Sequence, residues 1–350
     1  MELLVPVSDG GGLAAIPRLA REAEAAGFGI SVSERKSDPM LQLSLAAGAT
    51  VDATLMTNIV VAFARSPMTL AVQATAVQEY SRGRLMLGLG SQIKPHIERR
   101  YSMPWGSPAE RMEEYIRALR AIWDSWASGE RLEFRGQFYQ HTLMTPEFVP
   151  AISRPRPEVF LAAVGQRMTE VAGRVADGVI VHPFSTPRFL REATLPAFRR
   201  GAAEGGRAID ELRTAGAVPV VSGRTEEELA RSREQVRSRV AFYGSTAAYL
   251  PVLALHGWED LGRELTALSK TRDTERWSKM TRLVPDEVLH EFAVEGPPDE
   301  AGRAVAERYG GLIDLLSVYP DGLADPVVLF EVMAAIRAAA GDRPASIRQR

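Results

Sequence analysis

Two neighbouring stretches, residues 57–67 (TNIVVAFARSP) and residues 83–92 (GRLMLGLGSQ), carry the clearest structural signal in the sequence. Each contains a short, nearly continuous apolar run, which is typical of a strand that is buried on both faces. Runs of this kind recur along the chain, and segments with helical periodicity separate them. The predicted strands are residues 2–7, 29–33, 54–62, 84–89, 159–163, 178–182, 214–221 and 312–319. Eight parallel βα units close most naturally into a TIM (β/α)8 barrel, which is the fold class that we predict.

The predicted helix starts support this repeat. A side chain that can cap a helix accepts a backbone N–H without a partner, and a proline at the first helical position has no N–H to satisfy. Four dipeptides combine the two features: Asp38-Pro39, Ser66-Pro67, Ser107-Pro108 and Asp325-Pro326. We therefore expect helices to begin directly after each capping residue.

Two segments are longer than the βα repeat requires. Residues 130–157 resemble a small hairpin with a proline-rich connection, and residues 223–295 form a long, charged, mostly helical insertion. Extra segments on a barrel usually decorate the rim at the carboxyl ends of the strands, where active sites lie. We predict a single barrel domain over residues 1–350 with these two insertions at that rim.

Composition excludes several classes of function. The chain has 350 residues, a net charge of −2 and no cysteine, which excludes disulfides, thiolate metal sites and a cysteine nucleophile. No basic surplus indicates nucleic acid, and no apolar run approaches the ~18 residues of a membrane helix. No His/Asp/Glu cluster has the spacing of metal ligands, and no G-x-G-x-x-G follows a predicted strand. We expect a cytoplasmic protein that binds a small molecule, without a metal, a membrane or nucleic acid.

The two opening stretches also carry a family resemblance. The pairing of RSP at residues 65–67 with GRLMLGLG at residues 83–90 resembles the bacterial luciferase-like superfamily, and the likeness covers nearly the whole chain. Residues 93–105 (IKPHIERRYSMPW) are closer to its deazaflavin branch. The resemblance implies a TIM barrel, a homodimer, and a cofactor that is either coenzyme F-420, an 8-hydroxy-5-deazaflavin, or FMN.

The resemblance further implies which residues contact that cofactor. It implies a non-proline cis peptide between Asn58 and Ile59, and a phosphate at the helix start formed by residues 165–167, where backbone N–H groups favour an anion. A solvated first turn is the alternative there. Small residues such as Gly88 would leave room for a flat ring, although barrel strands also end in glycine for turns. The implied cofactor residues are Ser33, Asn58, Ile59, Gly90, Ser91, Ala163, Val164, Gly165, Gln166, Arg167, His182, Pro183 and Phe184.

The end of the second predicted strand bears on the chemistry. Sugar-phosphate dehydrogenase relatives carry an acidic residue followed by a histidine base there, whereas this chain has Glu34 followed by Arg35. Arginine stays protonated and cannot act as a base. Ser91 likewise stands where those relatives have a catalytic glutamate. Both departures favour reduction, with Glu34 as the catalytic proton donor if it is protonated; otherwise Glu34 forms a salt bridge with Arg35 or Arg65.

Four residues are expected on the substrate side: Arg35, His96, Tyr243 and Tyr249. For His182 the resemblance implies contact with the cofactor rather than catalysis. The working hypothesis is hydride transfer from the reduced deazaflavin to an imine or an activated C=C bond. An FMN-dependent monooxygenase and a catalytically silent flavin-binding barrel stay open as alternatives, and the substrate itself cannot be deduced from the sequence.

Overall fold

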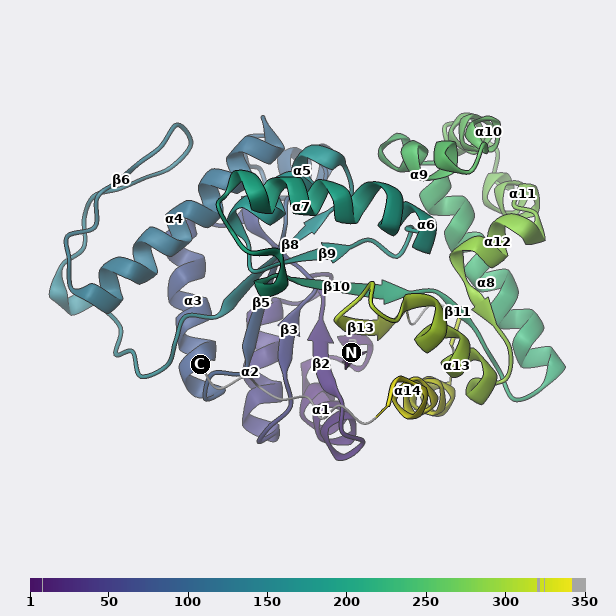
Figure 1. The fold of residues 1–350 in the computed structure, drawn as a ribbon, viewed down its shortest axis with the longest axis horizontal. Coiled ribbons are helices and arrows are strands. Elements are labelled where there is room, and N and C mark those ends of the chain that lie inside the picture. Colours follow the sequence, from purple (N-terminus) through teal and green to yellow (C-terminus); the bar gives the residue numbers. More distant parts are fainter. Residues whose placement is uncertain (8, 320–321, 324, 342–350) are drawn as a thin grey trace. The chain divides into compact units, whose positions relative to one another are not determined.

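The computed structural model describes residues 1–7, 9–319, 322–323 and 325–341. It divides into two compact units, each built from segments that are distant in the sequence. Figure 1 draws the helices and strands of both, coloured along the chain. Unit 1 comprises residues 1–6, 181–196 and 214–350, and unit 2 comprises residues 7–180 and 197–213. Strands alternate with helices through both units, and the chain has the TIM-barrel fold that its sequence predicts.

Unit 2 is built on adjacent parallel strands. Its strands β2 (Gly29–Val32), β3 (Leu55–Thr57), β5 (Leu85–Gly90) and β8 (Glu158–Ala163) pair in this order. The register places Ile30 opposite Leu55, Met56 opposite Met86, and Gly88 opposite Phe160. The short β4 (Val60–Val61) pairs with the end of β5, and β9 (Gly178–Val181) follows β8 along the chain.

Helices of unit 2 follow the strands in sequence. They are α1 (Ile16–Ala25), α2 (Pro39–Ala49), α3 (Pro67–Tyr80), α4 (Pro108–Ser128), α5 (Gln166–Val175) and most of α7 (Leu195–Glu204). The predicted caps hold for Asp38, which accepts from the N–H groups of Met40 and Leu41, and for Ser66, which accepts from Thr69. The predicted cap at Ser107 is wrong. Its φ of 39° and ψ of 61° are left-handed, whereas a capping side chain needs an extended backbone.

Unit 1 contains the remaining barrel strands and the helical insertion. Strands β1 (Glu2–Pro6), β13 (Leu315–Val318) and β10 (Arg213–Val218) pair in parallel, with Leu316 opposite both Leu3 and Gly216. Asp325 caps α14 by accepting from the N–H of Val327, as predicted. The helices of unit 1 are α6 (Pro187–Phe189), α8 (Glu226–Gly244), α9 (Leu250–Leu255), α10 (Glu259–Ser269), α11 (Arg276–Leu283), α12 (Asp286–Phe292), α13 (Pro298–Tyr309) and α14 (Pro326–Ala340).

All eight predicted strands are present, but two of them are interrupted. Residues 54–62 form β3 and β4, with Asn58 and Ile59 between them. Residues 214–221 form β10 and then β11 (Val220–Val221), which pairs with β12 (Val294–Glu295) in a separate two-stranded sheet. Within the described residues, no helix has the length and apolarity that crossing a bilayer requires.

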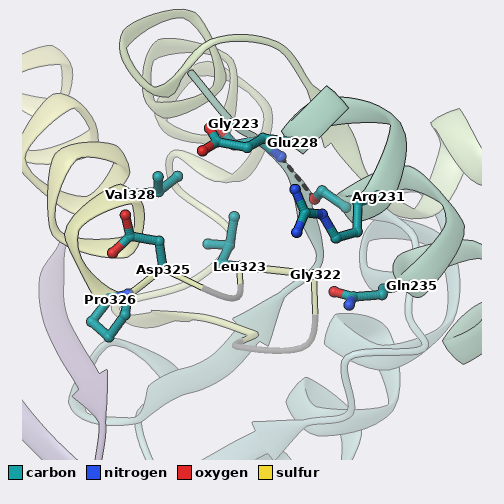
Figure 2. A pocket seen from close by; sticks show the side chains of 11 residues that line it. Gly223, Glu228, Arg231, Gln235, Gly322, Leu323, Asp325, Pro326 and Val328 are labelled. Atoms are coloured by element: carbon teal, nitrogen blue, oxygen red, sulfur yellow. Dashed lines mark hydrogen bonds between the residues drawn. The ribbon is translucent and has the colours of Figure 1, made fainter. Parts of the chain in front are cut away.

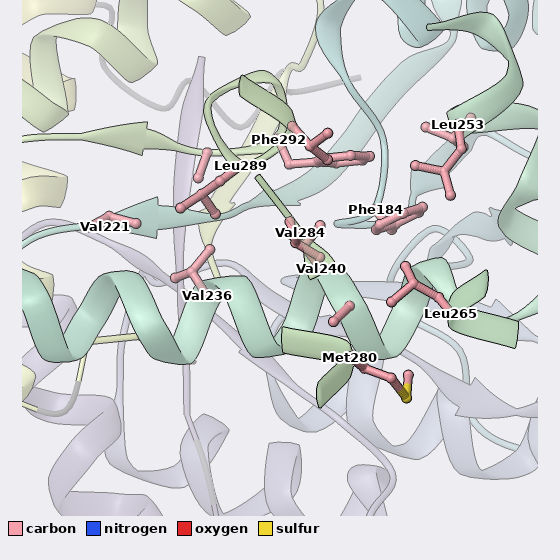
Figure 3. Close-up of a cluster of buried hydrophobic side chains, with 14 of the residues drawn as sticks. Phe184, Val221, Val236, Val240, Leu253, Leu265, Met280, Val284, Leu289 and Phe292 are labelled. Carbon is pink, nitrogen blue, oxygen red and sulfur yellow. The ribbon is translucent and has the colours of Figure 1, made fainter. Parts of the chain in front are cut away.

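The two segments that the sequence singles out as insertions contain a hairpin and a group of helices. In residues 130–157, β6 (Phe134–Arg135) and β7 (Gln140–His141) form an antiparallel hairpin. The carboxylate of Glu114 on α4 holds its turn by accepting from the backbone N–H groups of residues 137, 138 and 139 at 2.9, 2.6 and 2.7 Å. Helices α8 to α12 occupy most of residues 223–295, and their buried side chains form one hydrophobic core together with Phe184, Phe189 and Val221 (Figure 3). Phe184 and Phe292 stack within this core, with ring centroids 4.3 Å apart.

Candidate active site

The carboxyl end of β2 in unit 2 carries a buried ion-pair network. Glu34 Oε2 accepts from Arg65 Nη1 and from the backbone N–H of Val61, both at 2.8 Å. Arg65 Nη2 also donates to Asp38 Oδ2 at 2.8 Å. The side chains of Glu34 and Arg65 are only 8% and 12% exposed. Burial lowers the pKa of Arg65, but its hydrogen bonds to Glu34 and Asp38 outweigh this and raise that pKa above its usual range.

Of the two interpretations of Glu34, the salt bridge with Arg65 is therefore the one that forms. Tyr101 contributes a third donor, because its hydroxyl donates to Glu34 Oε1 at 3.1 Å. Both side-chain oxygens of Glu34 are therefore occupied as acceptors, from a guanidinium, an amide and a hydroxyl. The structure does not support the expectation that Glu34 is the catalytic proton donor, because each of these hydrogen bonds is one that Glu34 accepts. Its contacts hold β2, β4 and the segment around Tyr101 together.

Tyr101 is the residue of this network that sequence reasoning missed. It follows a turn of π-helix, η4 (His96–Arg100), in the connection between β5 and α4. Burial and the neighbouring Glu34 carboxylate raise the pKa of its hydroxyl, which keeps the proton on the oxygen. Arg100 Nη2 donates to the carbonyl of Arg35 at 3.0 Å and ties the same connection to β2. The side chains of Arg35 and His96, both predicted on the substrate side, are exposed.

Residues around the break between β3 and β4 come together as the resemblance implies. The peptide bond between Asn58 and Ile59 is cis. Ser33 Oγ donates to the carbonyl of Asn58 at 2.7 Å, and a Cβ added to Gly90 would meet Ile59 Cδ1 at 2.8 Å. Ser33, Asn58, Ile59 and Gly90 thus form one group at the carboxyl ends of their strands.

Gly88 does not leave room for a ligand ring. A Cβ there would lie 2.0 Å from the carbonyl oxygen of Thr57 and 2.8 Å from Ile180 Cδ1. The hydroxyl of Thr57 donates to the Gly88 carbonyl at 2.9 Å and accepts from its N–H at 2.8 Å. The interpretation of Gly88 as part of a ring slot is wrong, because close packing of two strands accounts for this glycine.

The end of β8 leads into an uncapped helix. Gly165 is the N-cap residue of α5, no side chain caps the helix there, and a Cβ at Gly165 would meet nothing within 4 Å. Ala163 ends the strand, and Val164 joins it to Gly165. Gln166 Nε2 donates to Glu170, and the Arg167 guanidinium, 81% exposed, pairs with Glu110. The first turn of α5 therefore presents backbone N–H groups to open space, which suits an anion.

The other two strand-end residues behave differently. Ser91, after β5, donates its hydroxyl to the carbonyl of Gln92 at 3.1 Å. Phe184, after β9, is 2% exposed and its ring packs in the helical core of Figure 3. The expected contact of the Phe184 side chain with a cofactor is not supported, because α12 supplies a stacking partner that the sequence did not reveal.

An aromatic group surrounds His182 in unit 1. The imidazole stacks on Tyr249 at 4.6 Å and meets Tyr243 edge-on at 4.7 Å between ring centroids. The hydroxyl of Tyr243 lies 2.7 Å from that of Tyr319, a residue at the end of β13 that was not predicted. Burial lowers the pKa of His182 to about 4. The predicted residues His182, Tyr243 and Tyr249 are thus brought together.

A separate cavity of about 370 Å³ lies in unit 1 between the start of α8 and the segment before α14 (Figure 2). Barrels often bind phosphate at the loops that follow their last two strands. Here Glu228 and Asp325 line the cavity, and the Arg231 at its wall lies 3.7 Å from Glu227. Two carboxylates disfavour an anion, so this cavity does not compete with the start of α5 as a phosphate site. Among the described residues, no group of three or more His, Asp or Glu side chains could hold a metal ion.

Comparison with known proteins places the chain among relatives that span most of its length. The profile of the luciferase-like monooxygenase family matches residues 4–315. An uncharacterized protein of Mycobacterium bovis is 48% identical over 305 residues, which cover 85% of this chain and 89% of the relative. A phthiodiolone/phenolphthiodiolone dimycocerosates ketoreductase of the same species is 27% identical over 253 residues, covering 69% and 63%.

Solved structures share the fold at low sequence identity. A coenzyme F-420-dependent tetrahydromethanopterin reductase from Methanopyrus kandleri superimposes with a TM-score of 0.76 at 19% identity, covering 95% of this chain and 97% of that one. An F-420-dependent secondary alcohol dehydrogenase with an F-420–acetone adduct gives 0.73 at 16% identity, covering 97% and 99%. The oxygenating constituent of 3,6-diketocamphane monooxygenase from Pseudomonas putida, in complex with FMN, gives 0.67 at 16% identity, covering 98% of each chain.

The family match over most of the chain, the 48% identical relative and the shared fold agree with one another. The chain therefore belongs to the luciferase-like monooxygenase family, whose members are oxidoreductases built on a TIM barrel.

Proposed function

We propose that the protein is a coenzyme F-420-dependent reductase that delivers hydride to an imine or an activated C=C bond of a small molecule. Two similar structures carry coenzyme F-420 in their names, and their TM-scores exceed that of the FMN complex. A distant relative is named as a ketoreductase. The two F-420-dependent proteins support a deazaflavin over FMN, and the names of the reductase and the ketoreductase support reduction.

The observation that carries the proposal is that Glu34 and Arg35, at the carboxyl end of β2, and Ser91, after β5, offer no suitable base. Oxidation of an alcohol needs a base to take the hydroxyl proton. Glu34 is committed to Arg65, Val61 and Tyr101, and the next residue is an exposed arginine. Serine at position 91 donates to a neighbouring carbonyl. None of these groups is suited to act as that base, whereas reduction needs a proton in place of a base, and solvent water can supply that proton once hydride has been transferred.

The residues present fit a phosphate-bearing deazaflavin. In unit 2 the proposal assigns its phosphate to the uncapped start of α5 at residues 165–167, and its ring to Ser33, Asn58, Ile59, Gly90, Ser91, Ala163 and Val164. In unit 1 it assigns a cofactor contact to His182 and Pro183, and a substrate contact to Tyr243 and Tyr249. A reduced deazaflavin supplies hydride from a ring carbon, and the protein contributes position and exclusion of water.

In this proposal Glu34 is a positioning residue. It keeps Arg65 charged and holds the Tyr101 connection against β2, where Arg35 and His96 lie on the exposed side. We further propose that residues 1–350 act as one luciferase-like domain and that the protein is a homodimer. Size-exclusion chromatography with light scattering measures the molar mass in solution. The mass of a single chain would contradict the homodimer.

Turnover tests the function. Reduced coenzyme F-420 is mixed anaerobically with the protein and with a panel of imines, enones and ketones, and oxidation of the deazaflavin is followed by its visible absorbance. We expect protein-dependent oxidation with an imine or an enone. Oxygen-dependent product formation with reduced FMN would replace the proposal with a monooxygenase. Cofactor binding without turnover of any acceptor would favour a silent binding barrel.

A further inference from the structure

The imidazole of His182 is held by three separate contacts within unit 1. The backbone N–H of Phe184 donates to its Nδ1 at 3.0 Å. Tyr249 lies against one face, with an angle of 27° between the rings, and Tyr243 meets it edge-on at 87°. The ring therefore has a fixed orientation that its own strand end and the helical insertion define together.

The contact at Nδ1 decides which nitrogen carries the proton. A backbone N–H is only a donor, so Nδ1 must accept and must be unprotonated. A neutral imidazole with a bare Nδ1 carries its proton on Nε2. No described residue accepts a hydrogen bond from Nε2, and this nitrogen is not among the fully buried polar atoms that lack a partner. The N–H of Nε2 is thus available to a molecule from outside the chain.

The surroundings of the ring do not favour a second proton. The titratable groups in ring contact with it are the hydroxyls of Tyr243 and Tyr249, and Tyr319 follows behind Tyr243. Burial raises the pKa values of Tyr243 and Tyr249, the latter to about 12, so the two hydroxyl groups beside the imidazole are uncharged. No carboxylate is among these neighbours to stabilise an imidazolium.

We infer that His182 is a neutral donor locked in the Nε2–H tautomer, and that this N–H positions a ligand by donating to one of its carbonyl oxygens. The carbonyl belongs either to the deazaflavin ring or to the substrate. This inference rests on the proposed function for the ligand, but the tautomer is a property of the protein alone. His182 is accordingly a positioning residue that does not exchange protons during turnover.

Long-range nitrogen–proton NMR spectra of protein labelled with ¹⁵N-histidine test the tautomer without any ligand. The chain has five histidines, and His182→Gln identifies the signals of this one. We expect a protonated Nε2 and a bare Nδ1 that do not change between about pH 5 and 8. His290, whose side chain is 57% exposed, provides the signal of a solvent-exposed histidine in the same samples. A proton on Nδ1, or titration of His182 near neutral pH, would overturn the inference.

Two variants test the donor. His182→Phe keeps a ring between the tyrosines and removes the N–H, whereas His182→Gln keeps an N–H donor at a similar distance. Losing one neutral hydrogen bond corresponds to roughly a two- to tenfold weaker interaction. We expect His182→Phe to weaken the binding of the cofactor or of the acceptor by this factor, and His182→Gln to weaken it much less. His290→Phe is the matched control. Circular dichroism and thermal unfolding establish that each variant is folded.

The affected constant identifies the source of the carbonyl. Weaker binding of coenzyme F-420 without substrate assigns it to the cofactor, and a higher KM for the acceptor at saturating cofactor assigns it to the substrate. Equal constants in wild type and His182→Phe would refute the positioning role. If the wild type binds no deazaflavin, the proposed function fails while the NMR result still decides the tautomer.

Discussion

Replacing Glu34 by glutamine tests the ion-pair network at the end of β2. The carboxylate has three donors around it, from Arg65, Val61 and Tyr101. A glutamine can keep its oxygen toward Arg65 and Val61 and donate its NH2 group to the Tyr101 hydroxyl, so the change removes the negative charge of the ion pair while it conserves the shape. Removing one member of a buried ion pair costs about 3–5 kcal/mol. We expect about 3 kcal/mol, at the low end of that range, because Arg65 keeps Asp38 and the Val61 carbonyl.

Thermal unfolding measures the effect. An unfolding entropy of about 2.1 cal/mol/K per residue, over a chain of 350 residues, converts ~3 kcal/mol into a fall in Tm of about 4 °C. Glu22→Gln is the matched control, because Glu22 also pairs with an arginine but is 49% exposed. Such a surface pair contributes only about 0.2–0.5 kcal/mol, which corresponds to less than ~1 °C. An equally small change for Glu34→Gln would refute the buried network.

Three further predictions concern other parts of the chain. Since the folded-state pKa of His182, about 4, lies below the ordinary 6.5, its stabilising contribution is complete above pH 6.5 and is lost as the pH falls through 4. Between pH 7 and 5 wild type should thus lose about 2 kcal/mol more stability than His182→Phe in urea unfolding; equal losses would contradict the burial of this ring. Gly90→Ala should cost about 1–3 kcal/mol by displacing Ile59, whereas Gly106→Ala, with nothing within 4 Å, should be nearly neutral. Equal denaturation midpoints for these two would contradict that packing. Phe292→Ala should lower the unfolding free energy by about 3–5 kcal/mol, and a loss below ~1 kcal/mol would mean that the helical insertion lacks the hydrophobic core of Figure 3.

Sequence periodicity was sufficient for the strands because each buried strand is a local pattern. The interruptions of these strands at residues 58–59 and at Pro219 were not part of the strand prediction, since each depends on pairing partners elsewhere in the chain. Ser107 shows the limit of a local cap pattern. Its dipeptide is the same type as Ser66-Pro67, yet the incoming connection imposes a left-handed backbone.

The family resemblance named several residues at strand ends that the structure brings close to one another. Ser33, Asn58, Ile59 and Gly90 were expected together and lie together. Tyr101 could not be predicted, because its hydroxyl reaches Glu34 from a connection without periodicity. Tyr319 was missed for a related reason.

Tertiary contacts also changed the roles of residues that were predicted correctly by position. Gly88 lies within β5 and Phe184 follows β9, but the space beside each of them is already filled by protein. A sequence shows where small or aromatic residues stand along a strand. It does not show which distant side chain occupies the space beside them.

Binding of the cofactor tests the central claim most directly. Titration of the protein with oxidised coenzyme F-420 and, separately, with FMN is followed by the fluorescence of each compound. We predict saturable binding of the deazaflavin, weakened when Gly165→Pro alters the start of α5, and much weaker binding of FMN. Tight FMN binding with no uptake of the deazaflavin would contradict the account.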